Sequence, residues 1–245
     1  MTMDRREIVA IDIQAPAAKV WQHLRQPDLV RRWYRWDAPD LDAHVRDFVA
    51  AHEGRDAASR HTLTWHNHDV LTVGAAEHRP DVTHVTVSRT SHDLAAFDGV
   101  QDFADAVWIA GIEQLRFAIT VHPGQPRRTL SSFGLDAGDP RDRTLDRAGL
   151  HGVRGIPLGG NVQARRPDGT LLGGTLLRKT EDLIVLHLHG ITQAMLVLIE
   201  TPAASAPPHG TVGAVLSTYG LDDETFEQVH TRWSAWWQLS LPRVS

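Results

Sequence analysis

Histidine pairs are the residues of this 245-residue chain whose type and spacing are best suited to chemistry. On a strand, His66 and His68 would share one face, and so would His187 and His189. Paired imidazoles can bind a metal ion or transfer protons near neutral pH. The first pair lies in residues 65–69 (WHNHD), however, and this composition is also typical of a polar turn. We predict no metal site and no cofactor, and keep His66 as a candidate ligand contact or base.

The second pair lies in the apolar run LIVLHLH, which predicts a strand with at least one buried face. His187 and His189 could therefore point into a cavity as ligand contacts, or simply bond to neighbouring polar groups. His92 follows a predicted strand, and Asp93 could orient it for proton transfer, although adjacent residues on an extended chain point apart. No serine lies in a Gly-x-Ser-x-Gly elbow. The sequence contains no recognisable catalytic motif.

Composition narrows the classes of partner. The formal charge is −5 and no block of Lys and Arg is long enough to follow a phosphate backbone, so we expect no nucleic-acid partner. The chain has no cysteine, which excludes disulfides and thiolate chemistry. No apolar stretch is long enough for a membrane span, and the first residues lack the apolar core of a signal peptide. We expect a cytoplasmic protein.

Two long helices that contain Trp must position these residues, at 100–121 and 222–239. Each follows a run of strand-like segments joined by short turns, which favours antiparallel sheets. Residues 41–49 suit either a strand or a helix, and we expect a strand there. We also expect a short helix from Asp139 to about Leu150. Residues 122–126 (HPGQP) have the composition of a linker. The sequence therefore predicts an α+β protein with domains at 1–122 and 127–245.

Helical spacing indicates which side chains the long helices bury. In the first, an apolar stripe comprises Val100, Phe103, Val107, Gly111 and Leu115. Asp105 and Glu113 fall between the members of this stripe, so we expect both to be solvated. In the second, the stripe comprises Phe226, Val229, Trp233 and Trp237.

The first half resembles the SRPBCC superfamily of START and Bet v 1-like helix-grip proteins, and most of all bacterial relatives of the heat-shock-protein ATPase activator. The resemblance covers about residues 6–121. It is carried by Ile13-Gln14-Ala15-Pro16, Val20-Trp21, residues 27–33, Leu63-Thr64-Trp65, residues 83–89 and the helix centred on Trp108. The second half matches only in element order and terminal Trp helix, so it resembles a degenerate second copy.

The resemblance implies two tandem helix-grip units, each an antiparallel sheet wrapped around a long C-terminal helix. It further implies a cavity between sheet and helix for a small hydrophobic, lipid- or polyketide-like molecule. An enzyme of the polyketide cyclase or dehydratase type and a chaperone-activator-like interaction module are the alternatives. The expected ligand contacts are Trp33, Trp36, His66, His92, Phe103, Val107, Trp108, Gly111, His187, His189, Trp233 and Trp237. Trp33 and Trp36 would lie at the cavity mouth, although Trp33 could equally belong to the core.

Overall fold

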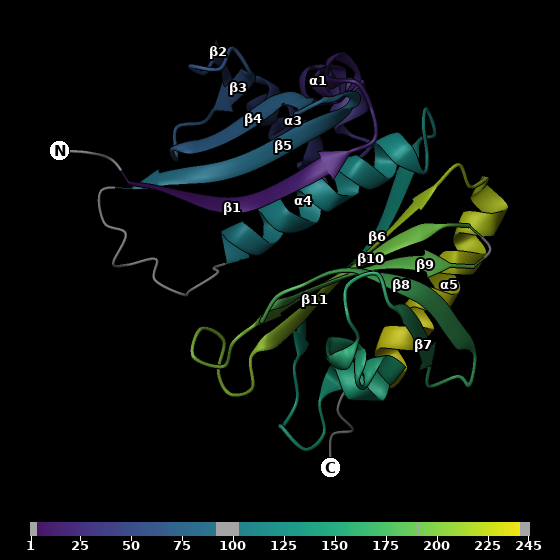
Figure 1. The fold of residues 1–245 in the computed structure, drawn as a ribbon. Helices are drawn as coiled ribbons and strands as arrows, with labels where there is room; N and C mark the ends of the chain where they lie inside the picture. Colours follow the sequence, from purple (N-terminus) through teal and green to yellow (C-terminus); the bar gives the residue numbers. More distant parts are fainter. Residues whose placement is uncertain (1–3, 92–102, 191, 241–245) are drawn as a thin grey trace. The chain divides into compact units, whose positions relative to one another are not determined.

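The computed structural model describes residues 4–91, 103–190 and 192–240 (Figure 1). The chain divides into two compact units, Met1–Gln125 and Pro126–Ser245. Each unit contains an antiparallel sheet, and a long helix follows the last strand of that sheet in the sequence. The predicted α+β class with two helix-grip units is confirmed.

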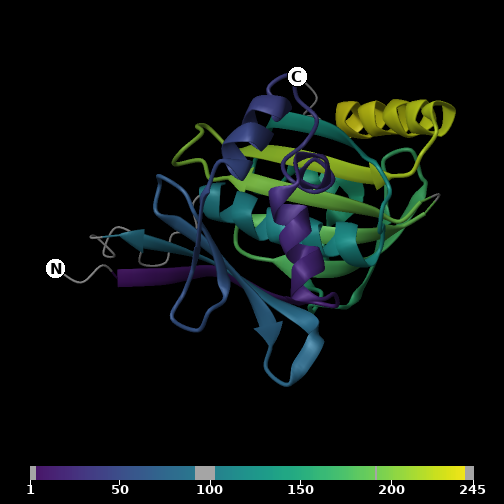
Figure 2. The ribbon, with the colours of Figure 1, turned by 90° about the horizontal axis from the view of Figure 1, so that it is seen from above.

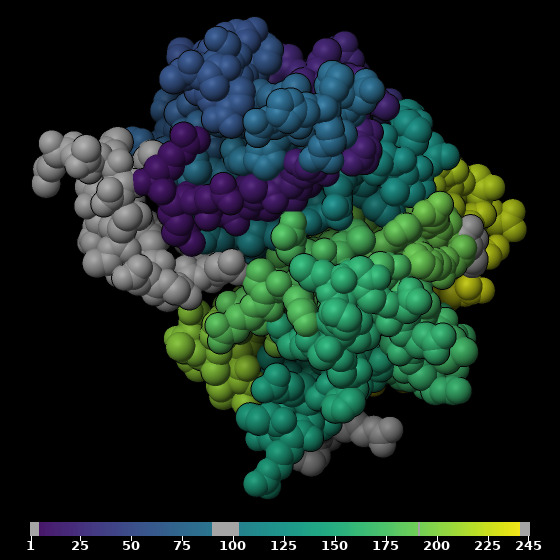
Figure 3. All heavy atoms as spheres, viewed as in Figure 1, coloured from purple at the N-terminus to yellow at the C-terminus, as the bar shows by residue number. Residues whose placement is uncertain are grey.

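The sheet of the first unit has five antiparallel strands in the order β1-β5-β4-β3-β2. Its strands are β1 Asp4–Ile13, β2 His52–Arg55, β3 His61–Thr64, β4 Asp69–Ala76 and β5 Arg79–Ser91. Figure 3 shows atoms of this part of the chain, purple to blue, on the face in view. The short edge strand β2 was not predicted; its HEGR sequence has no alternation of apolar and polar residues.

The described residues of this unit also form four helices: α1 Ala17–Arg25, α2 Pro27–Val30, α3 Leu41–Val49 and α4 Phe103–Thr120. Figure 2 shows α1 to α3 in purple to indigo, and Figure 1 shows α4 running along β1. The prediction of a strand at 41–49 was wrong. Leu41, Val45 and Phe48 are buried at helical spacing, so this segment satisfies a period of 3.6 and not of 2.

The inner face of the first sheet follows from strand register. Leu63, Leu71, Val87 and Val9 lie opposite one another across four strands, and all four are buried. A bulge between Glu7 and Val9 shifts the register of β1. Because side chains alternate along a strand, the residues two positions away in each strand share this face.

Helix α4 is buried on more than one side, which corrects two expectations. Asp105 and Glu113 are completely buried, although their places off the apolar stripe suggested solvation. A helix that is apolar on nearly all sides buries its off-stripe positions too, provided that their charges are paired. Arg6 pairs with Asp105, and Arg116 pairs with Glu113. The stripe residue Phe103, by contrast, is 52% exposed at the start of the described helix.

The sheet of the second unit has six antiparallel strands in the order β6-β11-β10-β9-β8-β7. They are β6 Arg127–Asp136, β7 Asn161–Arg165, β8 Leu171–Lys179, β9 Leu183–His189, β10 Ala194–Thr201 and β11 Thr211–Tyr219. Helix α5, Asp223–Ser240, packs over this sheet and is yellow in Figures 1 and 2. Asp168-Gly169 lies in the turn between β7 and β8.

The core of the second unit lies between α5 and one face of the sheet. Trp233, Trp236 and Trp237 are buried there with Ile184 and Leu186 of β9. The short helix expected at 139–150 is instead the π-helical turn η2, Asp146–Leu150, followed by the 3-10 turn η3, Val153–Gly155.

Gly149 explains why this helix is only one turn long. Its φ is +83°, a left-handed conformation in which a regular helix cannot continue, and a Cβ there would lie 1.9 Å from the backbone oxygen of Arg165. The close approach of the Arg165 backbone therefore requires glycine at position 149, and the left-handed conformation of Gly149 ends the helix.

Within the described ranges, no helix is both long and apolar enough to cross a membrane.

Candidate functional site

Five aromatic side chains gather in the first unit, and we call them the aromatic cluster: Trp33, Tyr34, Phe48, Trp65 and Trp108. The ring centroids of Trp33 and Phe48 are 5.3 Å apart, and those of Phe48 and Trp65 are 5.1 Å apart. Trp65 and Trp108 are separated by 5.2 Å. These tilted and edge-on contacts are the arrangement that aromatic quadrupoles favour.

Four separate elements bring the cluster together. Trp33 follows α2, Phe48 belongs to the buried stripe of α3, Trp65 follows β3, and Trp108 lies on α4. Trp33 and Phe48 are 1% and 2% exposed, whereas Trp65 and Trp108 are only half-buried. The cluster therefore has a closed side, which belongs to the core, and an accessible side formed by two indole rings.

A row of charged side chains continues the inner face of the sheet beside this cluster. Strand register places Asp69 of β4 opposite Arg89 of β5, and Arg89 opposite Arg6 of β1. Asp105 on α4 faces the row. We call these four residues the charged row.

The charged row is closely bonded and largely buried. Arg89 donates from Nε to Asp69 Oδ1 at 2.7 Å and contacts Asp105 Oδ1 at 3.3 Å. Arg6 donates to the other oxygen of Asp105 at 2.5 Å. Both carboxylate side chains are 1% exposed, while the Arg89 and Arg6 side chains are 12% and 24% exposed. Two positive and two negative groups balance, which is the condition for burying charge without a large penalty.

Trp108 joins the aromatic cluster to the charged row. Its indole Nε1 donates to Asp69 Oδ2 at 2.7 Å, and the Asn67 amide donates to the same oxygen at 2.8 Å. Asp69 thereby fixes the orientation of an indole that has an accessible part. Rigid aromatic surface beside guanidinium groups is suited to a planar apolar molecule that carries oxygen atoms.

Four more of the predicted ligand contacts, Trp33, Gly111, Trp36 and Val107, belong to the first unit. Trp33 is a core residue whose Nε1 donates to the backbone oxygen of His23 at 2.9 Å. Gly111 of α4 lies next to the Trp33 ring: a Cβ at Gly111 would be 3.7 Å from Trp33 Cζ3. Trp36 and Val107 are half-buried.

The first predicted histidine pair, His66 and His68, does not lie on a strand. His66 and His68 are exposed in the turn between β3 and β4, where His68 has a φ of 64°. The strand that would have aligned them ends at Thr64, so the turn interpretation holds and the shared strand face does not. His92 lies outside the described residues.

In the second unit, His187 and His189 lie on the face of β9 opposite the core formed with α5. Strand alternation accounts for this, since Ile184 and Leu186 face the buried Trp233 and Trp237. The two imidazole rings are 4.7 Å apart, and His189 Nε2 is 3.3 Å from Thr175 Oγ1. The cavity expected between α5 and the sheet is therefore not lined by this pair.

Sequence reasoning missed the charged row. Arg89 could have been found, because Val85, Val87 and Arg89 alternate along one predicted strand and must share its face. Its partner Asp69 was grouped with the polar turn, and nothing in the sequence states which strands pair or in what register.

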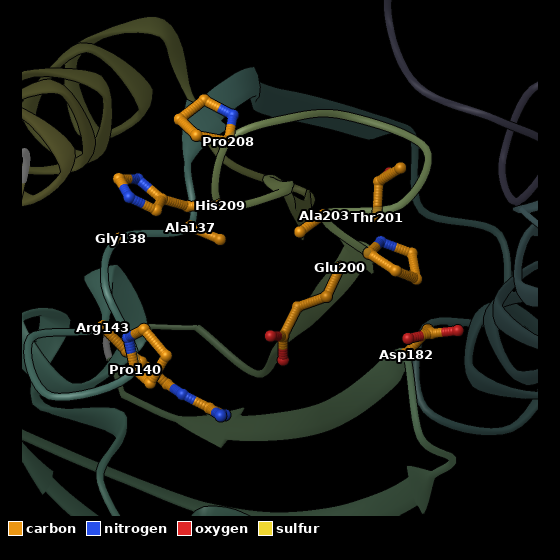
Figure 4. A pocket seen from close by; sticks show the side chains of 11 residues that line it. Ala137, Gly138, Pro140, Arg143, Asp182, Glu200, Thr201, Ala203, Pro208 and His209 are labelled. Atoms are coloured by element: carbon orange, nitrogen blue, oxygen red, sulfur yellow. The ribbon is translucent and has the colours of Figure 1, made fainter.

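A pocket of about 220 Å³ lies in the second unit, at the end of β10 (Figure 4). Segments 137–143 and 200–203 form two of its walls, with Asp182, Pro208 and His209 completing it. Figure 4 shows the Glu200 side chain extending into the open centre. Burial, and then the charges of Glu181 and Glu200, raise the pKa of the Asp182 carboxyl above its ordinary value.

Comparison with known proteins finds no matching family and no matching curated protein. Among solved structures, the chain is similar to the di-domain ARO/CYC BexL from the BE-7585A biosynthetic pathway, with 11% identity and a TM-score of 0.35 over 98% of this chain and 97% of that one. It is similar to the di-domain ARO/CYC StfQ from the steffimycin pathway, with 12% identity and a TM-score of 0.35 over 95% and 94%. DynU16 from the dynemicin biosynthetic locus gives 14% identity and a TM-score of 0.29 over 97% and 96%.

Proposed function

We propose that the first unit binds a planar, mainly apolar molecule with oxygen substituents, of the polyketide type, on the accessible side of the aromatic cluster. One observation carries the proposal: Trp65 and Trp108 are half-buried, yet Trp108 is locked by a hydrogen bond to the fully buried Asp69. An indole that served only the core would be enclosed. An oriented and accessible indole is a preorganised surface for stacking.

The charged row supplies polarity next to that surface. Arg6 and Arg89 keep part of each side chain accessible, at 24% and 12%. Guanidinium groups donate hydrogen bonds to carbonyl, phenolate or carboxylate oxygens. The ligand would therefore lie with its rings against Trp65 and Trp108 and with an oxygen directed toward Arg6.

Calorimetric titration of the full chain with a dihydroxyanthraquinone tests this proposal. Trp65→Ala should weaken binding about tenfold, since one stacking contact is worth roughly 1 kcal/mol beyond the apolar area that it buries. Trp21→Ala is the matched control, because Trp21 is also half-buried but stacks on His61 away from the cluster. Equal losses in the two variants would contradict the proposal.

Arg6→Gln separates recognition of oxygen from stacking. It should weaken binding of the dihydroxyanthraquinone and leave binding of unsubstituted anthracene unchanged. Asp105 retains Arg89 as a partner in this variant, so the network keeps one of its two cations at that carboxylate. Similar effects on both ligands would show that Arg6 acts through the fold.

An enzyme of the cyclase type is the second candidate, and the same two guanidiniums favour it. Positive groups fixed beside a bound poly-β-ketone could stabilise the enolate that forms during ring closure. Of the bases predicted for such a step, His66 is exposed in its turn and His92 lies outside the described residues. Incubation with a linear poly-β-ketone analogue, followed by mass and NMR analysis of the product, distinguishes turnover from binding alone.

A chaperone-activator-like role has less support. Such a role needs a contiguous exposed apolar patch of several hundred Å². The exposed large hydrophobic side chains of the described residues come from five separate segments: Phe103, Phe133, Leu158, Leu171 and Leu239. We therefore favour a small molecule over a protein as the ligand.

A further inference from the structure

The pocket of the second unit has apolar walls and charged groups of both signs. Ala137, Pro140, Pro202, Ala203 and Pro208 provide the apolar surface. The charged and titratable groups come from different segments of the chain: Arg143, Asp182, Glu200 and His209. Figure 4 shows Arg143 and Glu200 reaching toward the centre from separate segments.

Two of these four groups are already paired within the unit. Arg154 donates to Glu200 Oε1 and also to the backbone oxygen of Thr180. His209 lies with Nδ1 3.1 Å from Asp136 Oδ1. Burial of these groups therefore leaves little uncompensated charge.

The other two groups have no such pairing. Across the described part of the chain, the side chains of Asp182 and Arg143 form neither a hydrogen bond nor an ion pair. Asp182 is half-buried, and its backbone oxygen, not its carboxylate, accepts from the amide of Glu200. Arg143 is exposed at the opposite wall. One negative and one positive group thus face a pocket of about 220 Å³ without a partner from the chain.

We propose that this pocket is a second binding site, which takes a small zwitterion with an ammonium group and a carboxylate, of the amino-acid class. Asp182 would accept hydrogen bonds from the ammonium group, and Arg143 would donate to the carboxylate. The alanine and proline side chains would contact the carbon chain between them. The site is independent of the ligand proposed for the first unit.

A zwitterion fits the pocket better than a metal ion does. In the ranges that the structure describes, no three His, Asp or Glu side chains are placed to hold a metal. Arg154 offsets the charge of Glu200 through Oε1, whereas the Asp182 carboxylate accepts no hydrogen bond from the described residues. An organic ammonium needs only one such carboxylate together with apolar contacts.

Binding of ω-amino acids to the full chain tests the proposal. Saturation-transfer NMR should be run with a series from glycine to 6-aminohexanoate, because the chain length scans the separation of the two charges. Butylamine and butyrate, each with a single charge, are the reference ligands. We expect one length to bind best and both reference ligands to bind at least about tenfold more weakly, since each lacks one charge-assisted hydrogen bond.

Neighbouring residues supply matched variants. Asp182→Asn should weaken the best ω-amino acid about tenfold or more, whereas Glu181→Gln removes the same charge one residue away and should have little effect. Arg143→Gln and Arg141→Gln form the second pair, since Arg141 is exposed and does not line the pocket.

The reference ligands assign each charge. Butylamine binding should respond to Asp182→Asn alone, and butyrate binding to Arg143→Gln alone. No binding across the series would overturn the proposal, and so would equal effects in the matched variants. Competition by calcium chloride at constant ionic strength would also overturn it, because it would identify the occupant as a metal ion.

Discussion

Replacing Asp69 by alanine should be among the most damaging single changes in the first unit. Its carboxylate accepts two hydrogen bonds from Arg89, one from Trp108 and one from Asn67, and the residue is completely buried. After substitution, Arg89 loses both of its hydrogen bonds to Asp69, and the Trp108 indole loses its acceptor. Breaking a buried pair in this way costs about 3–5 kcal/mol.

Native-state hydrogen exchange of the full chain measures this loss where it occurs. The free energy of opening for amides of β4 and β5 should fall by about 3–5 kcal/mol in Asp69→Ala. Asp81→Ala is the control, since Asp81 is exposed and should change stability by no more than about 0.5 kcal/mol. A loss below roughly 1 kcal/mol in Asp69→Ala would refute the view that the charged row is a buried network.

Three further predictions concern other parts of the chain. Gly111→Ala should raise the free energy of unfolding by about 0.5–1 kcal/mol in a urea titration, because the new methyl group meets Trp33 at an ordinary 3.7 Å within a helix; a loss of stability would contradict the helix packing. Gly149→Ala should lower the melting temperature far more than Gly159→Ala. Both glycines have positive φ, but only at Gly149 would a Cβ collide with backbone, at 1.9 Å; equal effects would refute the close approach. Asp182→Asn should stabilise the protein above the raised pKa of this carboxyl, since the folded state then no longer holds a poorly solvated charge. The gain should fade in urea titrations as the pH falls toward the ordinary value of about 3.9, where the unfolded state also becomes protonated.

The order of helices and strands could largely be predicted, because apolar residues recur along most of them at regular spacing. The apolar run from Leu183 to His189 is a strand with the predicted ends. The terminal Trp helix differs from its prediction by only one residue at each end. The segment 41–49 failed because its few apolar residues suit two periods, and only packing of Phe48 against Trp33 decides between them.

The candidate site was harder to predict because it depends on pairing between distant strands. Nothing local states that Asp69 lies opposite Arg89, or that Arg6 adjoins both. Helical spacing likewise assigned Asp105 to solvent, because the periodicity of one helix does not reveal a cation on β1. The aromatic residues were found more readily, since Trp33 and Trp108 are recognisable from type alone.

Fluorine NMR of the full chain containing 5-fluorotryptophan tests the central claim most directly. The protein has eight tryptophans, so each gives a resonance that single Trp→Phe variants can assign. On titration with a dihydroxyanthraquinone, the resonances of Trp65 and Trp108 should shift together, while those of the buried Trp233, Trp236 and Trp237 stay in place. Unchanged resonances for Trp65 and Trp108 at saturation, or shifts confined to the three tryptophans of α5, would contradict a ligand site on the aromatic cluster.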